Sequence, residues 1–78
     1  MREVKISLGT IEKVKDFVSI MTRLSTEIDL ISGRYVVDAK SIMGIFSLDL
    51  SKPITLRINA EGEAAEEVIK VIKEYLVG

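Results

Sequence analysis

The feature that most constrains the fold is a repeated switch between two hydrophobic periods along the 78 residues. Apolar residues recur at every second position in some segments, as on a half-buried strand, and at steps of three and four in others, as on an amphipathic helix. The clearest alternation follows Pro53 and continues to Ala60. Because proline is tolerated at the start of a strand, we expect a strand over this segment.

Three other segments have the pattern of strands. Residues 4–8 alternate between apolar and polar side chains, and residues 26–31 and 35–39 are β-branched, aromatic or alternating. Between the latter two lies Ser32-Gly33-Arg34, where the glycine allows a tight reversal of the chain. The sequence therefore predicts a hairpin here.

The helical periods predict three helices. The first covers residues 11–24 with Thr10 as its cap, and the last begins at Gly62 and continues to Leu76. A short helix of about two turns is expected over residues 41–48, with Ser41 in the capping position.

The expected order is strand, helix, strand, strand, short helix, strand, helix, in one domain of residues 1–78. Each strand and each long helix has one apolar face, so the simplest closure packs the helices on one face of a four-stranded antiparallel sheet. The predicted fold is an α+β open-faced sandwich.

Composition excludes several classes of function. Eleven basic and twelve acidic residues give a net charge of -1, which provides no field for a nucleic acid or an anionic membrane surface. The chain has no histidine and no cysteine, so we expect no metal site, no cofactor and no chemistry by an imidazole or a thiol. The absence of cysteine and of an apolar leader at the start favours the cytoplasm.

A resemblance to a known family rests on residues 38–48, in which Lys-Ser-Ile-Met-Gly occupies residues 40–44. This segment resembles HPr, the histidine-containing phosphocarrier family of the bacterial sugar phosphotransferase system, and the order of elements agrees over essentially the whole chain. The resemblance implies the HPr-like fold and a role without catalysis.

In the family a phosphoryl-accepting histidine caps the first helix within Gly-x-His-Ala-Arg-Pro. Counting back from Lys40 without gaps puts Thr10 at the histidine and Glu12 at the arginine, whereas a slip of one residue puts Ile11 at the histidine. Neither residue replaces an imidazole, because a carrier needs a nitrogen nucleophile whose phosphoryl group is easily passed on. A carboxylate at Glu12 would also repel phosphate. The resemblance thus implies a chain that is not a histidine phosphocarrier.

Ser41 matches the family serine that a dedicated ATP-dependent kinase phosphorylates, so HPr kinase and a regulator or sugar-transport component are the partners that the resemblance implies. A helix start favours a phosphate, and Lys40 is adjacent; an unmodified cap explains the same serine. The following helix has more apolar residues than one stripe can bury. We interpret these residues as a partner-docking surface, with a tight core as the alternative: Ile42, Met43, Ile45, Phe46 and Leu48.

Two rival functions come from other classes. A ligand-binding regulatory domain of ferredoxin-like topology would need a second full-length helix between the third and fourth strands, where only about ten residues are available. An enzyme would need a partner for an acid or base such as Asp38 or Glu61, and the sequence offers none.

Overall fold

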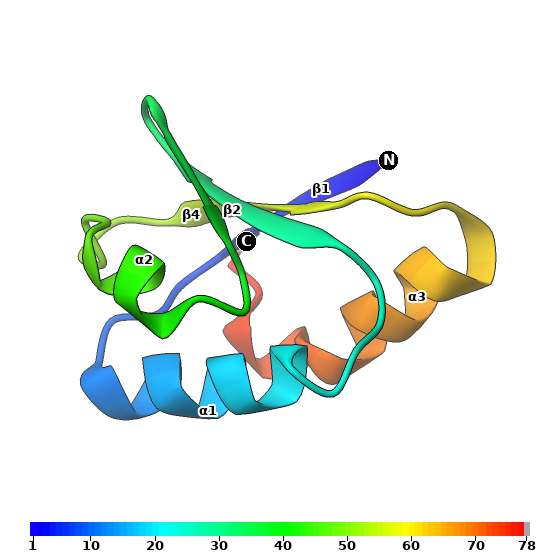
Figure 1. Cartoon of the computed structure of the whole chain (residues 1–78), viewed down its shortest axis with the longest axis horizontal. Coiled ribbons are helices and arrows are strands. Elements are labelled where there is room, and N and C mark those ends of the chain that lie inside the picture. The colour runs from blue at the N-terminus through cyan, green and yellow to red at the C-terminus, as the bar shows by residue number, and fades with distance from the viewer. Residues whose placement is uncertain (78) are drawn as a thin grey trace.

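The computed structural model describes residues 1–77, which form one antiparallel sheet with helices on one of its faces (Figure 1). The predicted open-faced α+β sandwich is confirmed. The elements, in chain order, are β1 (Arg2–Ile6), α1 (Ile11–Met21), β2 (Ile28–Ser32), β3 (Tyr35–Asp38), α2 (Ile42–Phe46), β4 (Ile54–Ile58), α3 (Gly62–Val71) and a 3₁₀ turn (Lys73–Tyr75).

The sheet has the strand order β1-β4-β2-β3, with every neighbouring pair antiparallel. Its register aligns Val4, Leu56, Leu30 and Val37 in one row across the four strands. These side chains share a face because alternate residues of a strand point the same way. The strand pattern predicted from alternation therefore sets the inner face of the sheet.

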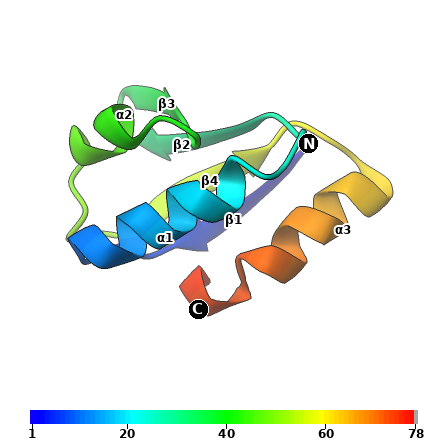
Figure 2. The same ribbon diagram turned by 60° about the horizontal axis from the view of Figure 1, so that its bottom comes forward.

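Helices α1 and α3 run beneath the inner face, and α2 lies beside α1 below the β2–β3 hairpin (Figures 1 and 2). The stripe of α1 buries Val14, Phe17 and Met21. The 3₁₀ turn adds Tyr75, whose ring meets that of Phe17 edge to face with centroids 5.5 Å apart, a favourable arrangement for aromatic rings. These contacts close the core between the sheet and the helices.

Two predicted boundaries differ from the structure for one reason. The first strand ends at Ile6 instead of residue 8, and the last helix ends at Val71 instead of Leu76. After Ile6 the chain pairs with the C-terminal segment: the Ser7 amide donates to the Tyr75 carbonyl at 2.9 Å. This pairing between segments far apart in sequence cannot be read from local periodicity.

The other differences are smaller. The first helix ends at Met21 rather than residue 24, and the hairpin strands are Ile28–Ser32 and Tyr35–Asp38. Gly33 makes the predicted reversal with a φ of 59°, a conformation that glycine adopts without strain. Between β3 and β4 the chain forms only the five-residue α2, so the second full-length helix that would favour a ferredoxin-like ligand domain does not form there. In the described part of the chain, no helix is long and apolar enough to cross a bilayer.

Candidate functional site

The start of α1 is a helix cap made by Thr10. Its backbone is extended, with φ -131° and ψ 158°, and its Oγ1 accepts a hydrogen bond from the Lys13 amide at 3.1 Å. This bond satisfies one of the free amides of the first turn, so the predicted capping role is confirmed. Glu12 is exposed in the same turn, and its carboxylate already complements the positive end of the helix dipole.

The start of α2 has the same kind of cap, but a different turn of the chain leads into the helix. The Ser41 Oγ accepts from the Gly44 amide at 3.2 Å, which confirms Ser41 as the cap. The chain enters through a turn in which Asp38 Oδ1 accepts from the Lys40 amide at 2.8 Å, and the Ser41 amide donates to the Asp38 carbonyl at 2.9 Å. In this turn Asp38 is a structural acceptor.

Gly44 lets α2 approach the sheet closely. A Cβ added at this position would lie 3.2 Å from Val37 Cβ on β3 and 3.1 Å from the Ser41 Oγ. Both distances are shorter than ordinary van der Waals contact, so the absence of a side chain keeps the helix start and its serine against the hairpin. The glycine of the Lys-Ser-Ile-Met-Gly segment thus has a packing role.

The sequence suggested that Lys40 could help to bind a phosphate on Ser41, but in the structure its side chain is bonded elsewhere. The lysine is partly buried, and its Nζ donates to the Leu24 carbonyl at 2.6 Å, just beyond the end of α1. The lysine therefore gives a partner to a backbone carbonyl in the loop that follows α1. The Lys40 ammonium therefore joins α1 to the α2 turn and is already engaged by the protein.

The predicted docking residues divide into two groups, and for two of them the prediction was wrong. Ile45 is fully buried and Leu48 is 6% exposed, so both belong to the core and cannot contact a partner in this conformation. Met43 is 78% exposed and Phe46 39% exposed, while Ile42 is half-buried. A helix of five residues has only one side against the sheet, and that side takes Ile45.

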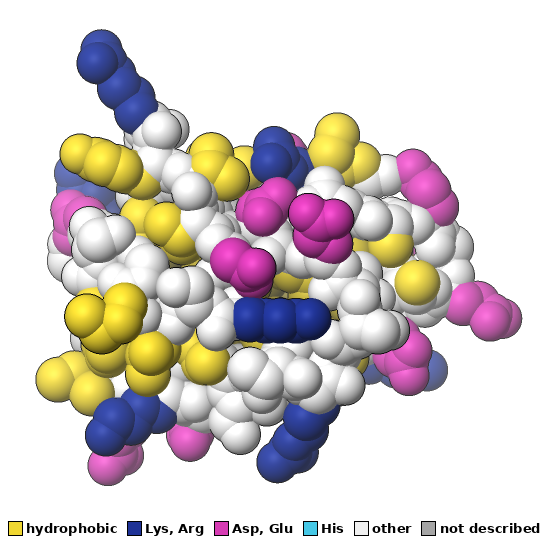
Figure 3. Space-filling model, in the orientation of Figure 1, with side chains coloured by type: hydrophobic (Ala, Val, Ile, Leu, Met, Phe, Trp, Pro, Cys, Tyr) yellow, Lys and Arg dark blue, Asp and Glu magenta, His cyan; other side chains and the backbone are white. Residues whose placement is uncertain are grey.

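A further exposed residue, Ile11, was missed because its spacing places it on the buried stripe of α1. It is 62% exposed, since it lies in the first turn of the helix. Helices α1 and α2 are in contact, and Figure 3 shows hydrophobic side chains gathered over α2 and the start of α1. We call Ile11, Ile42, Met43 and Phe46 the α1–α2 apolar patch. Ser41 begins the helix that carries three of its members.

The acids considered for catalysis are used elsewhere. Glu61 is exposed and forms an ion pair with the Met1 amine, and this hydrogen bond and charge hold the pKa of the Glu61 carboxyl below its usual value. A carboxyl with a lowered pKa stays ionised and is a poor general acid. Within residues 1–77, no cluster of three acidic side chains has the arrangement to hold a metal ion.

Comparison with known proteins adds independent findings. The family profile described as "PTS HPr component phosphorylation site" matches residues 12–77. The phosphocarrier protein HPr from Bacillus anthracis is similar over 97% of this chain and 94% of its own, with 30% identity and a TM-score of 0.71. HPr-C-His from Thermoanaerobacter tengcongensis is similar over 95% of this chain and 93% of its own, with 28% identity and a TM-score of 0.73.

A third similar structure is Crh, the Bacillus subtilis catabolite repression containing protein, described as a swapped, intertwined dimer. It has 28% identity and a TM-score of 0.63, over 96% of this chain and 90% of its own. The profile match begins at Glu12. Thr10 and Ile11, the two alternatives that we expect at the position of the family histidine, therefore lie outside the matched segment.

Proposed function

This chain belongs to the HPr family of the phosphotransferase system, and we propose that it acts by protein contact, switched at Ser41, rather than as a histidine phosphocarrier. The observation that carries the proposal is the contrast between the two helix starts. The first has a threonine cap with a carboxylate beside it, and the second has an exposed serine at the apolar patch.

The carrier role fails on chemistry. The chain contains no histidine, and a phosphate ester on the Thr10 hydroxyl would be too stable to pass its phosphoryl group onward. The carboxylate of Glu12 adds negative charge in the same turn, which opposes an incoming phosphate. The start of α1 is best explained as a cap that holds the helix and its part of the patch.

Ser41 offers better conditions for a phosphate. Its side chain is exposed, the first turn of α2 has no acidic residue, and the Gly44 amide already donates to its Oγ. Phosphate oxygens are stronger acceptors than a hydroxyl and are favoured at the positive end of a helix. Because Lys40 is engaged with Leu24, the backbone amides of α2, rather than this lysine, would hold the phosphate.

The switch would act through the α1–α2 apolar patch. Two negative charges at Ser41 would lie within two residues of Met43, which is 78% exposed, and would change an apolar surface into one with an anionic edge. The unmodified protein would then favour partners that dock through apolar contacts, and the phosphorylated protein would favour partners with arginine or lysine side chains. The proposed partners are HPr kinase and a regulator or sugar-transport component in the cytoplasm, where ATP is supplied.

The first test is incubation with HPr kinase and ATP, followed by mass spectrometry. We expect one added phosphate on the wild type and none on Ser41→Ala. Two matched controls, Ser47→Ala at the other end of α2 and Thr10→Ala at the other cap, should keep full labelling. Labelling that persists in Ser41→Ala, or that is lost in Thr10→Ala, would contradict the assignment of the switch.

The second test supplies phosphoenolpyruvate and the first enzyme of the phosphotransferase chain. We expect no transfer, because the chain has no imidazole to receive the phosphoryl group. An HPr with its histidine intact serves as the positive control. Recovery of an acid-labile phosphoryl group on this chain would overturn the claim that it is not a carrier.

A further inference from the structure

The two edges of the sheet are protected to different degrees. At the β1 edge, the Val77 amide donates to the Lys5 carbonyl at 3.0 Å, and Leu76 forms a β-bridge with Ile6. At the β3 edge, within residues 1–77, no strand pairs with β3 on the side away from β2. Open edges of this kind pair readily with another chain, and β3 contains no proline or lysine that would prevent it.

The hydrogen-bond pattern of the hairpin shows which groups of β3 are unpaired. Antiparallel pairs alternate between hydrogen-bonded and non-hydrogen-bonded. The register pairs Ile31 with Val36 and ends with the pair of Asp29 and Asp38. One step beyond that last pair, Ile28 lies opposite Ala39, whose amide donates to the Ile28 carbonyl at 3.0 Å. By alternation from that bonded pair, Val36 lies in a non-hydrogen-bonded pair. Its N–H and C=O therefore point outward from the sheet.

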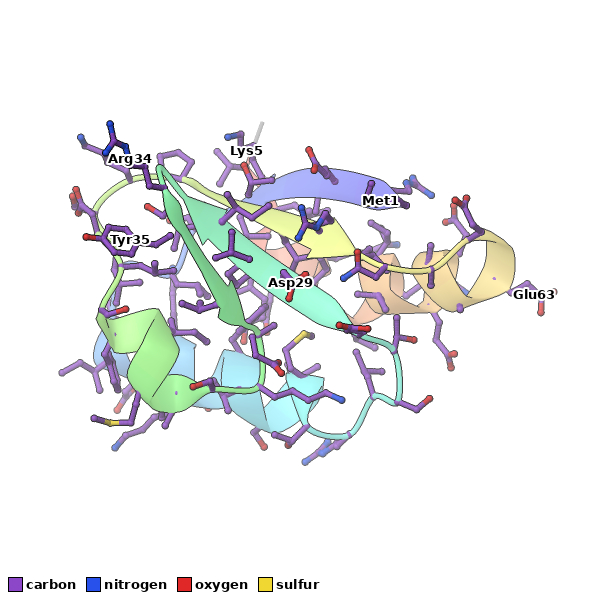
Figure 4. The ribbon with its side chains drawn as sticks, turned by 45° about the horizontal axis from the view of Figure 1, so that its top comes forward. Met1, Lys5, Asp29, Arg34, Tyr35 and Glu63 are labelled. Carbon is purple, nitrogen blue, oxygen red and sulfur yellow. The ribbon has the colours of Figure 1, made fainter. Side chains whose placement is uncertain are left out.

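Two of the exposed side chains on this edge are large and apolar. Tyr35 is 66% exposed and Val36 is 55% exposed, and Figure 4 shows Tyr35 and Arg34 at the free end of the hairpin. Neither residue belongs to the α1–α2 apolar patch. A strand that exposes both unpaired backbone groups and large apolar side chains is suited to β-augmentation.

We propose that β3 pairs antiparallel with β3 of a second copy of this chain, around a two-fold axis at Val36. In this register each Val36 faces its copy and exchanges two backbone hydrogen bonds with it. Tyr35 of one copy faces Val37 of the other. The two sheets would join into one continuous eight-stranded sheet.

Charge selects a second copy over another peptide. Arg34 and Asp38 are both exposed and lie two residues either side of Val36. Arg34 lies in the hairpin turn just before β3, and Asp38 is the last residue of that strand. Antiparallel pairing about Val36 therefore brings Arg34 of one copy beside Asp38 of the other, twice. Opposite charges in cross-strand pairs are favourable and like charges are not, so this edge is self-complementary, as a two-fold interface requires.

A single cysteine tests the register. Directly opposed residues of a hydrogen-bonded pair have Cα atoms about 5.5 Å apart, within the range that a disulfide spans, and the chain has no other cysteine. Val36→Cys should form a disulfide dimer on mild oxidation much faster than Val71→Cys, a control on α3 that is also exposed. Equal rates for the two variants would overturn the proposal.

Sedimentation across a wide range of protein concentration tests the contact without a covalent bond. We expect a reversible dimer whose dissociation constant rises about tenfold in Val36→Lys, because two lysines would then face each other. Arg34→Glu should weaken it too, whereas Met43→Lys on the apolar patch should not. Circular dichroism confirms that each variant folds. A wild type that stays monomeric, or a dimer lost only in Met43→Lys, would overturn the proposal.

Discussion

The starts of α1 and α2 use the same local bond and differ in almost everything else. Thr10 and Ser41 each accept from an amide three residues on, at 3.1 and 3.2 Å. Helix α1 then continues for eleven residues with three buried anchors, while α2 has five residues and only Ile45 buried. The comparison teaches that a cap does not define a site. The charge in the first turn and the packing behind it decide what the hydroxyl can do.

The largest expected effect comes from removing the anchor of α2. Ile45→Ala should lower the free energy of unfolding by about 2–5 kcal/mol, as truncation of a fully buried isoleucine does. Met43→Ala, two residues away and 78% exposed, should change it by less than about 0.5 kcal/mol. Urea unfolding measures both. Similar losses in the two variants would break the division of α2 into a buried and an exposed side.

The close packing of α2 against β3 can be tested by replacing each of two glycines with alanine and comparing the free energies of unfolding. Gly44→Ala places a methyl group 3.2 Å from Val37 Cβ and should destabilise by about 1–2 kcal/mol, despite the better helix propensity of alanine. Gly9, beside the cap of α1, has no atom within 4 Å of an added Cβ.

Gly9→Ala is therefore the matched control, and it should leave the unfolding free energy unchanged or raise it by about 0.4–1 kcal/mol. Thermal unfolding of both variants gives the comparison. If Gly44→Ala is as stable as Gly9→Ala, the close approach of α2 to β3 does not hold.

The smallest effect concerns the caps themselves. Thr10→Ala and Ser41→Ala should each lower the unfolding free energy by about 1 kcal/mol, because each exposes one unpaired amide. Amide hydrogen exchange locates the effect: the Gly44 amide should exchange faster only in Ser41→Ala, and the Lys13 amide only in Thr10→Ala. A loss of protection at both helices in either variant would show that the two starts are coupled.

Much of the fold could be predicted because its signals are local. The alternation after Pro53, the stripe of α3 and both caps depend on residues within a few positions of one another. The HPr-like order of elements followed from them, and comparison with known proteins confirms it. The end of β1 could not be predicted, because Ser7 leaves β4 to bond with Tyr75, 68 residues further along the chain.

The candidate site was less predictable for the same reason. Three of the four residues of the α1–α2 apolar patch were predicted, namely Ile42, Met43 and Phe46, but which residues of α2 face solvent depends on how this helix packs against the sheet. Ile45 and Leu48 were therefore assigned to a docking surface although they are buried, and Ile11, which is exposed, was left out of it. The hydrogen bond from Lys40 to Leu24 joins two residues that lie outside the helices and strands and 16 positions apart in the sequence. No sequence pattern predicts such a bond.

The strand order has a consequence for the chain as it leaves the ribosome. Strands β1 and β2 do not pair with each other, because β4 lies between them and pairs with both. Of the four strands, β4 is the last to be synthesised. Until residues 54–58 have emerged, the nascent chain contains a hairpin and a lone strand with no common neighbour in the sheet. Such non-local pairing must wait for its partner. The complete sheet therefore cannot form until β4 has been made.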